Sequence, residues 1–257
     1  MYKAFGDLVV LDDVSFFVNP GETLCILGRS GVGKSVALQH IMGFLKPDSG
    51  RIMVAGEDIT GFDEKQLQAI RRKVTMVFQN GALFDSLTVG ENVAFPLREH
   101  TDLSEPLIRT LVLMTLQAVG LRAAADQAPG ELSGGMARRV ALARAIVMDP
   151  EFIFYDEPFT GLDPISLGAI VCLIRRLNEA LGITSIVVSH DVGVIGHVAD
   201  FSYLIANGKV VARGTPEALK EDRSSWVHQF MNGLVEGPVP FHLPAPDYAG
   251  SLLEEEP

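Results

Sequence analysis

One octapeptide near the N-terminus constrains the fold of this chain more than any other feature. It reads Gly28-Arg29-Ser30-Gly31-Val32-Gly33-Lys34-Ser35 and fits the phosphate-binding pattern G-x-x-x-x-G-K-[ST]. A short apolar run at residues 24–27 precedes it, as expected for a strand that is buried on both faces. Residues 35–45 follow with apolar side chains at helical spacing and end before a Pro-Asp-Ser-Gly turn. Strand, glycine loop and helix in this order predict an α/β fold.

The glycine loop also predicts a ligand. Its glycines let backbone N–H groups turn toward phosphate oxygens, and the N-terminus of the following helix adds about half a positive charge. We expect Lys34 to reach the β and γ phosphates of ATP and the Ser35 hydroxyl to bind Mg²⁺. The simpler alternative is a glycine turn before an ordinary helix. The predicted ATP-binding residues are Gly28, Arg29, Ser30, Gly31, Val32, Gly33, Lys34, Ser35 and Val36.

Two acidic residues follow a second buried strand. Residues 152–155 are apolar, and Asp156 and Glu157 come directly after them. A buried parallel strand delivers such residues to the carboxyl edge of the sheet, where α/β proteins bind ligands. There Asp156 can hold Mg²⁺, and Glu157 can orient or deprotonate an attacking water. Without the glycine loop, the pair would read as two solvated loop acids.

A second candidate anion site lies about 100 residues after the first. The segment reads Leu132-Ser133-Gly134-Gly135-Met136, and Ser133 can cap the helix that follows while the glycines expose its first N–H groups. Taken alone this is only a capped helix. Together with the phosphate loop and the strand-borne Asp156-Glu157 pair, in this order, it resembles the signature motif of ABC-type ATPases. The resemblance covers residues 5–233.

That resemblance implies roles for further residues. Gln79 matches the glutamine that contacts Mg²⁺ and signals to the permease, and His190 matches the histidine that contacts the γ-phosphate. Asp163 matches an aspartate that contacts the second copy in a dimer. Phe5 stands where the family places an aromatic ring on the adenine base. The family also implies a head-to-tail homodimer, in which Ser133, Gly134 and Gly135 of one copy complete the ATP site of the other.

The same resemblance implies the domain plan. We expect a RecA-like P-loop NTPase core at residues 1–80 and 150–235, with an N-terminal antiparallel β subdomain and an all-α insertion at residues 81–149. Helical periodicity supports the insertion at residues 107–119 and 136–148. In the second part of the core, residues 165–181 are expected to form a helix and residues 184–189 a strand. A hairpin is expected to turn at Asn207-Gly208. Residues 9–18 read as strands broken by a turn.

Two features depart from the family pattern. Met136 stands where the family usually has glutamine, and a thioether is a much weaker hydrogen-bonding group. We expect activity to be retained with some change in nucleotide affinity. The chain also begins almost at Phe5, although family members usually have a strand before it. Either the true start lies upstream or this edge strand is short.

Within the family, the finer resemblance is to the ATPases of Mla-type lipid transporters in Gram-negative bacteria. The segments that carry it are residues 79–85, 92–100, 132–139 and 237–241. It implies transport of phospholipids between the inner and outer membranes, on the cytoplasmic face of the inner membrane, through an integral permease. It also implies a small STAS-type subunit and an Mce-type lipid-binding subunit as partners.

Composition, charge and motif content bear on alternative functions for this chain. The net charge is −11, and no run of basic residues exceeds the three at 71–73, so we expect no nucleic-acid partner. An ATPase of another ABC importer, for amino acids or another small solute, stays open. A soluble ABC ATPase usually has two fused nucleotide domains or a coiled coil, whereas this chain has one glycine loop, one signature segment and no heptads. A non-catalytic regulator would not need Glu157 and His190. Both alternatives are therefore less favoured.

The sequence shows no evident signal peptide or membrane helix. Cys25 and Cys172 are expected to be buried reduced thiols.

The C-terminal segment, residues 236–257, has a different composition from the rest of the chain. Five of the 14 prolines lie in residues 238–257, interleaved with apolar side chains such as Phe241 and Tyr248. Prolines keep such a segment extended, and its apolar side chains need a surface to cover. We expect this tail to pack across the dimer or against a regulatory subunit. An acidic, disordered extension is the alternative.

Overall fold

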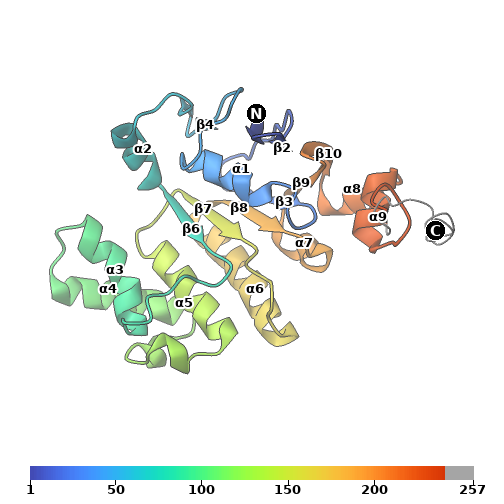
Figure 1. Cartoon of the computed structure of the whole chain (residues 1–257). Coiled ribbons are helices and arrows are strands. Elements are labelled where there is room, and N and C mark those ends of the chain that lie inside the picture. Colours follow the sequence, from blue (N-terminus) through green and yellow to red (C-terminus); the bar gives the residue numbers. More distant parts are fainter. Residues whose placement is uncertain (241–257) are drawn as a thin grey trace, which may run out of the picture.

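A six-stranded sheet forms the centre of the molecule in the computed structural model, which describes residues 1–240 (Figure 1). The strands lie side by side in the order β10-β9-β3-β8-β7-β6. All neighbouring pairs are parallel except β9 and β10, so the predicted α/β fold is confirmed. The strands are β3 (Thr23–Leu27), β6 (Val74–Val77), β7 (Phe152–Asp156), β8 (Thr184–Ser189), β9 (Phe201–Ala206) and β10 (Lys209–Gly214).

Helices cover both faces of this sheet because its central strands are apolar on both faces. Along β3, Leu24 and Ile26 belong to a core shared with α1 (Lys34–Ile41) and α2 (Glu64–Arg71). Cys25 and Leu27 belong to the opposite core, which contains α5 (Gly134–Ile146), α6 (Pro164–Leu181) and α7 (Val192–Val198). Figure 1 shows α1 on one side of the sheet and α6 on the other.

Two expected elements are shorter than the sequence suggested. Helix α1 ends at Ile41 and not at residue 45, because Gly43 adopts a φ of +68°. In the segment 9–18, only the beginning is strand, within β2 (Leu8–Leu11). The N–H of Asp12 donates to the carbonyl of Gly208. The next residue, Asp13, has a φ of +56°, which turns the chain out of the strand direction.

The antiparallel part near the N-terminus consists of two separate two-stranded sheets. One pairs β1 (Lys3–Phe5) with β2, and the other pairs β4 (Met53–Val54) with β5 (Glu57–Asp58). A bridge between Tyr2 and Ser49 connects the two regions. The strand that carries Phe5 is therefore a short edge strand of three residues.

Between β6 and β7 the chain forms only helices and turns. They are α3 (Val89–His100), α4 (Glu105–Ala118), two 3₁₀ turns (Arg122–Ala124 and Pro129–Glu131) and α5. A separate apolar core, with Val93, Leu116 and Val140 among its members, joins α3, α4 and α5. This agrees with an all-α insertion, although the boundaries 81 and 149 stay a prediction.

The chain after β9 begins with the expected hairpin. Asn207 and Gly208 both have positive φ, as a type I′ turn requires. Helices α8 (Pro216–Glu221) and α9 (Ser225–Asn232) follow. Residues 236–240 of the expected tail are described, whereas its residues 241–257 lie outside the described part. No helix in residues 1–240 has the length and apolar character needed to cross a membrane.

Candidate functional site

Four predicted motifs meet at one edge of the sheet. Strands β3, β8, β7 and β6 are consecutive neighbours and run parallel, so their carboxyl ends lie together. The glycine loop follows β3, and His190 follows β8. Asp156 ends β7 with Glu157 next to it, and Gln79 lies two residues after β6. The candidate site is therefore assembled at the sheet edge where α/β proteins bind ligands.

Lys34 begins α1, and its side chain reaches back into the glycine loop. Its Nζ donates to the carbonyl oxygens of Gly28 at 2.8 Å and Arg29 at 3.1 Å, and its side chain is only 5% exposed. Gly28 must be glycine, because its φ is +154° and an added Cβ would lie 2.5 Å from the carbonyl oxygen of Ile205. The loop thus binds the buried ammonium group of Lys34, and the loop backbone at Gly28 packs against β9.

Ser35 and Asp156 bring two oxygen ligands together. The Ser35 hydroxyl donates to Oδ1 of Asp156 at 2.9 Å, across 121 positions of sequence. Burial raises the pKa of Asp156, the bond from Ser35 opposes that shift, and the charge of Glu157 adds to it. A hydroxyl and a carboxylate are the hard oxygen donors that Mg²⁺ prefers, and that ion usually takes few protein ligands. The pair therefore fits a Mg²⁺ site.

Glu157 lies between two basic side chains. Its Oε1 is 3.2 Å from Nζ of Lys34, and its Oε2 is 2.8 Å from Nδ1 of His190. Its backbone is in the left-handed region, with a φ of +50°, and its N–H bonds to the carbonyl of Val188 at 2.9 Å. A non-glycine residue in this region is uncommon and is found preferentially at functional sites. The arrangement presents a mostly buried carboxylate that can accept a proton from a bound water.

Two predicted site residues stand apart from this group. Gln79 is exposed, and none of the side-chain hydrogen bonds in residues 1–240 involves it. Phe5 is 47% exposed on the edge strand β1, with Nζ of Lys3 5.4 Å from its ring centre. The structure thus joins Lys34, Ser35, Asp156, Glu157 and His190, but it does not link Gln79 or Phe5 to them.

The second candidate anion site lies at the N-terminus of α5. Ser133 caps this helix as predicted, its Oγ accepting from the N–H of Met136 at 3.3 Å. Ser133 and Gly134 are exposed, whereas Gly135 is buried against α6, where an added Cβ would lie 2.5 Å from Oγ of Ser166. No hydrogen bond in residues 1–240 connects these three residues to the glycine loop of the same chain.

Asp163 caps the N-terminus of α6. Its Oδ1 accepts from the N–H groups of Ile165 and Ser166 at 2.9 and 3.0 Å. Hydrogen bonds from Ser166, first from its side chain and then from its backbone, lower the pKa of Asp163. The Asp163 residue is exposed, so a contact with another chain is compatible with the cap.

Sequence reasoning assigned no role to Thr160, which lies near Glu157, or to Arg138, which contacts the loop after Glu157. Thr160 places its Oγ1 3.5 Å from Oε2 of Glu157. Arg138 of α5 donates to the carbonyl oxygens of Pro158 at 2.7 Å and Thr160 at 2.9 Å. Only the proximity of Thr160 in sequence could have pointed to it. Arg138 is 20 positions from Pro158 in the sequence, and no local pattern signals their contact.

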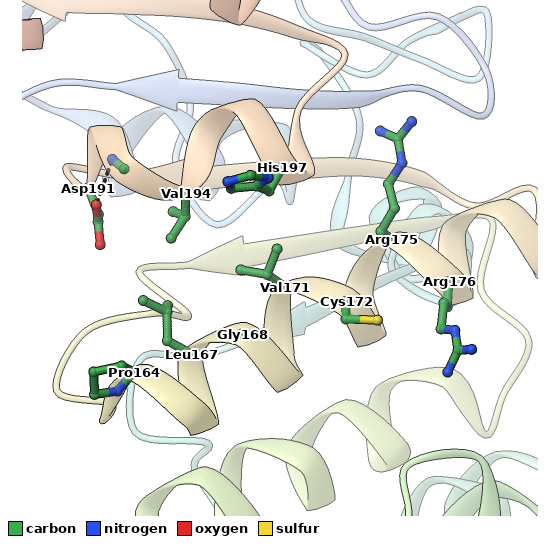
Figure 2. Close-up of a pocket in the computed structure, with 11 residues that line it drawn as sticks. Pro164, Leu167, Gly168, Val171, Cys172, Arg175, Arg176, Asp191, Val194 and His197 are labelled. Carbon is green, nitrogen blue, oxygen red and sulfur yellow. Dashed lines mark hydrogen bonds between the residues drawn. The ribbon is translucent and has the colours of Figure 1, made fainter.

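A groove of about 620 Å³ lies beside this site, between α6 and α7 (Figure 2). Its floor is apolar, with Leu167, Val171 and Val194, and Arg175 and Arg176 extend at one end. Cys172 lies in this groove and is exposed, so the expectation of two buried thiols is wrong for this residue. Cys172 lies on α6, whereas Cys25 is buried in the central strand β3 and is free as expected.

Comparison with known proteins places this arrangement in a family. A family model described as "ABC transporter" matches residues 11–160, which is more than half of the chain. The chain belongs to the ABC transporter family. The match contains the glycine loop, Gln79, the signature segment and the Asp156-Glu157 pair of this ABC protein.

Relatives of this ABC protein extend the match to nearly its whole length. It is 52% identical over 249 residues to the intermembrane phospholipid transport system ATP-binding protein MlaF of Haemophilus influenzae, covering 97% of this chain and 94% of that protein. It is 48% identical over 248 residues to MlaF of Escherichia coli strain K12, covering 96% and 92%. A probable ribonucleotide transport ATP-binding protein, mkl of Mycobacterium tuberculosis, is 40% identical over 237 residues, covering 92% and 66%.

Solved structures agree with this fold. The ABC protein resembles cbiO1 of Clostridium perfringens, part of the ABC transporter complex cbiONQ, with a TM-score of 0.80 and 32% identity over 86% of this chain and 88% of that one. It also resembles the ATP-binding cassette MJ0796, a dimer bound to ADP and Pi, with a TM-score of 0.75 and 32% identity over 84% and 95%. The predicted P-loop fold is therefore confirmed.

Proposed function

We propose that this chain is the ATP-hydrolysing subunit of an ABC transporter that moves phospholipids between the inner and outer membranes. The observation that carries the ATPase activity is the Glu157 carboxylate, held between Lys34 and His190 at the edge of the sheet. The likeness to MlaF proteins, at 48–52% identity over nearly the full length, supports the phospholipid substrate.

The geometry supports a proposed catalytic role for each of these residues. Backbone N–H groups of residues 28–36 bind the phosphates of ATP, and Lys34 exchanges its bonds to loop carbonyls for bonds to the β and γ phosphates. Glu157 accepts a proton from the attacking water. His190 bonds to Oε2 of this carboxylate, and we assign to it a contact with the γ-phosphate. Phe5, on its exposed edge strand, is available to stack on adenine.

Oxygen ligands complete the nucleotide site. Ser35 and Asp156 would hold Mg²⁺. Gln79, two residues after β6, is the third proposed ligand. Bound Mg²⁺ offsets the negative charge that the phosphates carry during transfer. The protein's own contribution is to keep the hydroxyl and the carboxylate in contact before nucleotide arrives.

The active form is a head-to-tail dimer of two such chains. Ser133 and Gly134 are exposed at a helix N-terminus, and within residues 1–240 no hydrogen bond is donated by their backbone N–H groups. In the dimer, Ser133, Gly134 and Gly135 of one copy bind the ATP held by the glycine loop of the other, and Asp163 lies at the contact. The dimeric arrangement of the MJ0796 cassette, at 32% identity, supports this proposal.

The dimer binds the cytoplasmic face of the inner membrane through an integral permease. An Mce-type lipid-binding subunit and a small STAS-type subunit complete the proposed assembly. The names of the MlaF relatives, which belong to a phospholipid transport system, support a transport assembly of this kind. An importer for another solute is the alternative, and the 40% identity to a probable ribonucleotide transport ATP-binding protein is the observation that favours it.

Purification of the assembled transporter tests the substrate. A tagged Glu157→Gln chain, which should trap the ATP-bound complex, would be purified from membranes with its partners, and bound subunits and lipids would be identified by mass spectrometry. We expect a permease, a lipid-binding subunit and enriched phospholipid. Copurification of a solute-binding protein without phospholipid would favour the importer instead.

A further inference from the structure

Arg138 connects two functional segments of the same chain. It lies on α5, one turn after the signature residues Ser133–Gly135 at the N-terminus of that helix. Its Nη1 donates to the carbonyl oxygen of Pro158 at 2.7 Å, and its Nη2 donates to that of Thr160 at 2.9 Å. These carbonyls belong to the loop that directly follows Glu157. The planar fork of arginine suits two acceptors at fixed spacing, which lysine cannot reproduce.

The backbone is strained at Glu157, directly before the loop that Arg138 holds. Glu157 has a φ of +50°, a conformation that a non-glycine residue keeps only when its surroundings enforce it. The loop's own bond, from the N–H of Thr160 to the carbonyl of Glu157, is long at 3.4 Å. Within residues 1–240, no side chain other than Arg138 donates to the carbonyls of Pro158 or Thr160. Arg138 is therefore a main restraint on the loop position.

A second contact joins the same two segments. Gly135, in the first turn of α5, packs so closely on Ser166 that an added Cβ would lie 2.5 Å from its Oγ. Ser166 belongs to the first turn of α6, which begins where the loop after Glu157 ends. The N-terminus of α5 thus contacts both ends of the segment 158–166, and a shift of the helix must move that segment.

We propose that Arg138 is a positioning residue that transmits nucleotide binding at one site of the dimer to Glu157 of the other site. This inference rests on the proposed head-to-tail dimer. There, α5 of each copy contacts the ATP bound to its partner, while Glu157 of the same copy serves its own ATP. ATP that anchors the N-terminus of α5 fixes, through Arg138, the loop that aims Glu157. Each site then supports hydrolysis at the other, and the two sites act cooperatively.

The test places Arg138→Gln in one chosen copy of the dimer. Assembled transporter would be purified through two different tags, so that one copy has a working Glu157 and the other carries Glu157→Gln. Only the first copy hydrolyses ATP. We expect Arg138→Gln to lower kcat about 10-fold when it lies in the copy with the working Glu157, because small misplacements of a catalytic group are costly. In the other copy it should leave kcat close to the parental value, and KM should change little in both arrangements.

The competing structural role gives the opposite pattern. If Arg138 only supports the signature end of α5, the loss will follow the copy that carries the inactive Glu157→Gln site, because its α5 serves the working site. That result, or an equal loss in both arrangements, would overturn the proposal, as would no loss in either. In the symmetric Arg138→Gln dimer the Hill coefficient for ATP should fall toward 1, and Arg138→Lys should restore only part of the rate.

Two controls keep these outcomes separate from misfolding and from failure of the dimer. Arg139→Gln removes the neighbouring charge on α5, whose single bond to the carbonyl of Val119 is 3.3 Å long and lies away from the loop. It should keep kcat near parental, and thermal unfolding of both variants should be compared. Ser133→Arg in the copy with the inactive site should abolish the remaining activity. If it does not, the composite dimer is wrong, independently of the Arg138 result.

Discussion

Nδ1 of His190 lies 2.8 Å from Oε2 of Glu157, although the two residues are 33 positions apart. Lys34 approaches the other carboxylate oxygen at 3.2 Å, so each oxygen of Glu157 has a basic neighbour. A carboxylate held from two sides keeps its plane and direction. This geometry makes the contributions of the three residues separable by mutation.

Lys34 and Glu157 should differ in which step they affect. We expect Lys34→Ala to abolish tight ATP binding, because it removes the only buried cation that the described site offers to phosphate. Glu157→Gln should keep binding but lower hydrolysis at least about 100-fold, since an amide cannot accept the proton of water. Equilibrium binding of a fluorescent ATP analogue and phosphate release measure the two steps. Near-parental hydrolysis by Glu157→Gln would contradict the catalytic role.

His190 should act on the rate and leave binding intact. We expect His190→Ala to lower kcat about 100-fold, because Glu157 loses its partner at Oε2 and the γ-phosphate loses a contact. Its side chain is 47% exposed, so the substitution should cost little folding stability. Single-turnover hydrolysis and thermal unfolding check both statements. A variant with parental kcat would show that Glu157 is adequately held by Lys34 alone.

Asp156 gives a prediction about pH. Burial and the charge of Glu157 raise its pKa above the ordinary value of 3.8, so the folded state binds the proton more tightly than the unfolded state. The stabilising contribution of this group is then complete below pH 3.8 and is lost as pH rises through the raised folded-state pKa. Asp156→Asn avoids that loss.

We therefore expect the nucleotide-free Asp156→Asn variant to melt above the parent at neutral pH, with the difference shrinking toward pH 4 (about the ordinary carboxyl pKa). The same variant should lose Mg²⁺-dependent hydrolysis. Calorimetry across pH in the absence of Mg²⁺ measures the first effect. A variant that melts below the parent at neutral pH would contradict the assigned burial effect.

Two adjacent glycines provide a matched pair. In Gly135→Ala the new methyl group would meet Ser166, and overpacking of this kind costs about 1–3 kcal/mol of stability. In Gly134→Ala nothing lies within 4 Å of the new atom, so stability should be kept or slightly raised. Thermal unfolding of the two variants tests this difference. Equal stability of the pair would show that the contact between α5 and α6 is adaptable.

The tail supplies a prediction about assembly. Gln229 of α9 binds the backbone of Val239 through both ends of its amide, at 2.8 and 2.9 Å, which anchors the start of the tail. Residues 241–257 lie outside the described part. We expect removal of residues 237–257 to leave nucleotide binding by the isolated chain intact but to weaken dimer or complex assembly and transport.

Gln229→Met, which keeps the size of the side chain but loses both bonds, should weaken assembly in the same direction and to a smaller extent. Analytical ultracentrifugation with ATP, and pull-down of the transporter, measure these effects. A truncated chain that assembles and transports like the parent would favour the alternative, in which the tail is a disordered extension.

Several elements could be predicted because their signals are local. The run of buried residues in β3 and β7, the hairpin at Asn207-Gly208 and the cap at Ser133 depend on neighbours within a few positions. Element ends were less predictable. Helix α1 stops at Ile41 because of the backbone of Gly43, and β2 stops because Asp12 bonds to Gly208, about 200 residues later.

By itself the sequence determined the chemical groups: a glycine loop with Lys34 and Ser35, two acids after a buried strand, and a capped helix rich in glycine. Spacing and side-chain type are sufficient for these, because each motif folds on residues that are adjacent in the chain. Only the tertiary structure decided which groups meet. Placing β8 between β3 and β7 brings His190 to Glu157, and packing α5 against the loop brings Arg138 to Pro158. Such contacts depend on strand order and helix packing, which residues distant in sequence establish together.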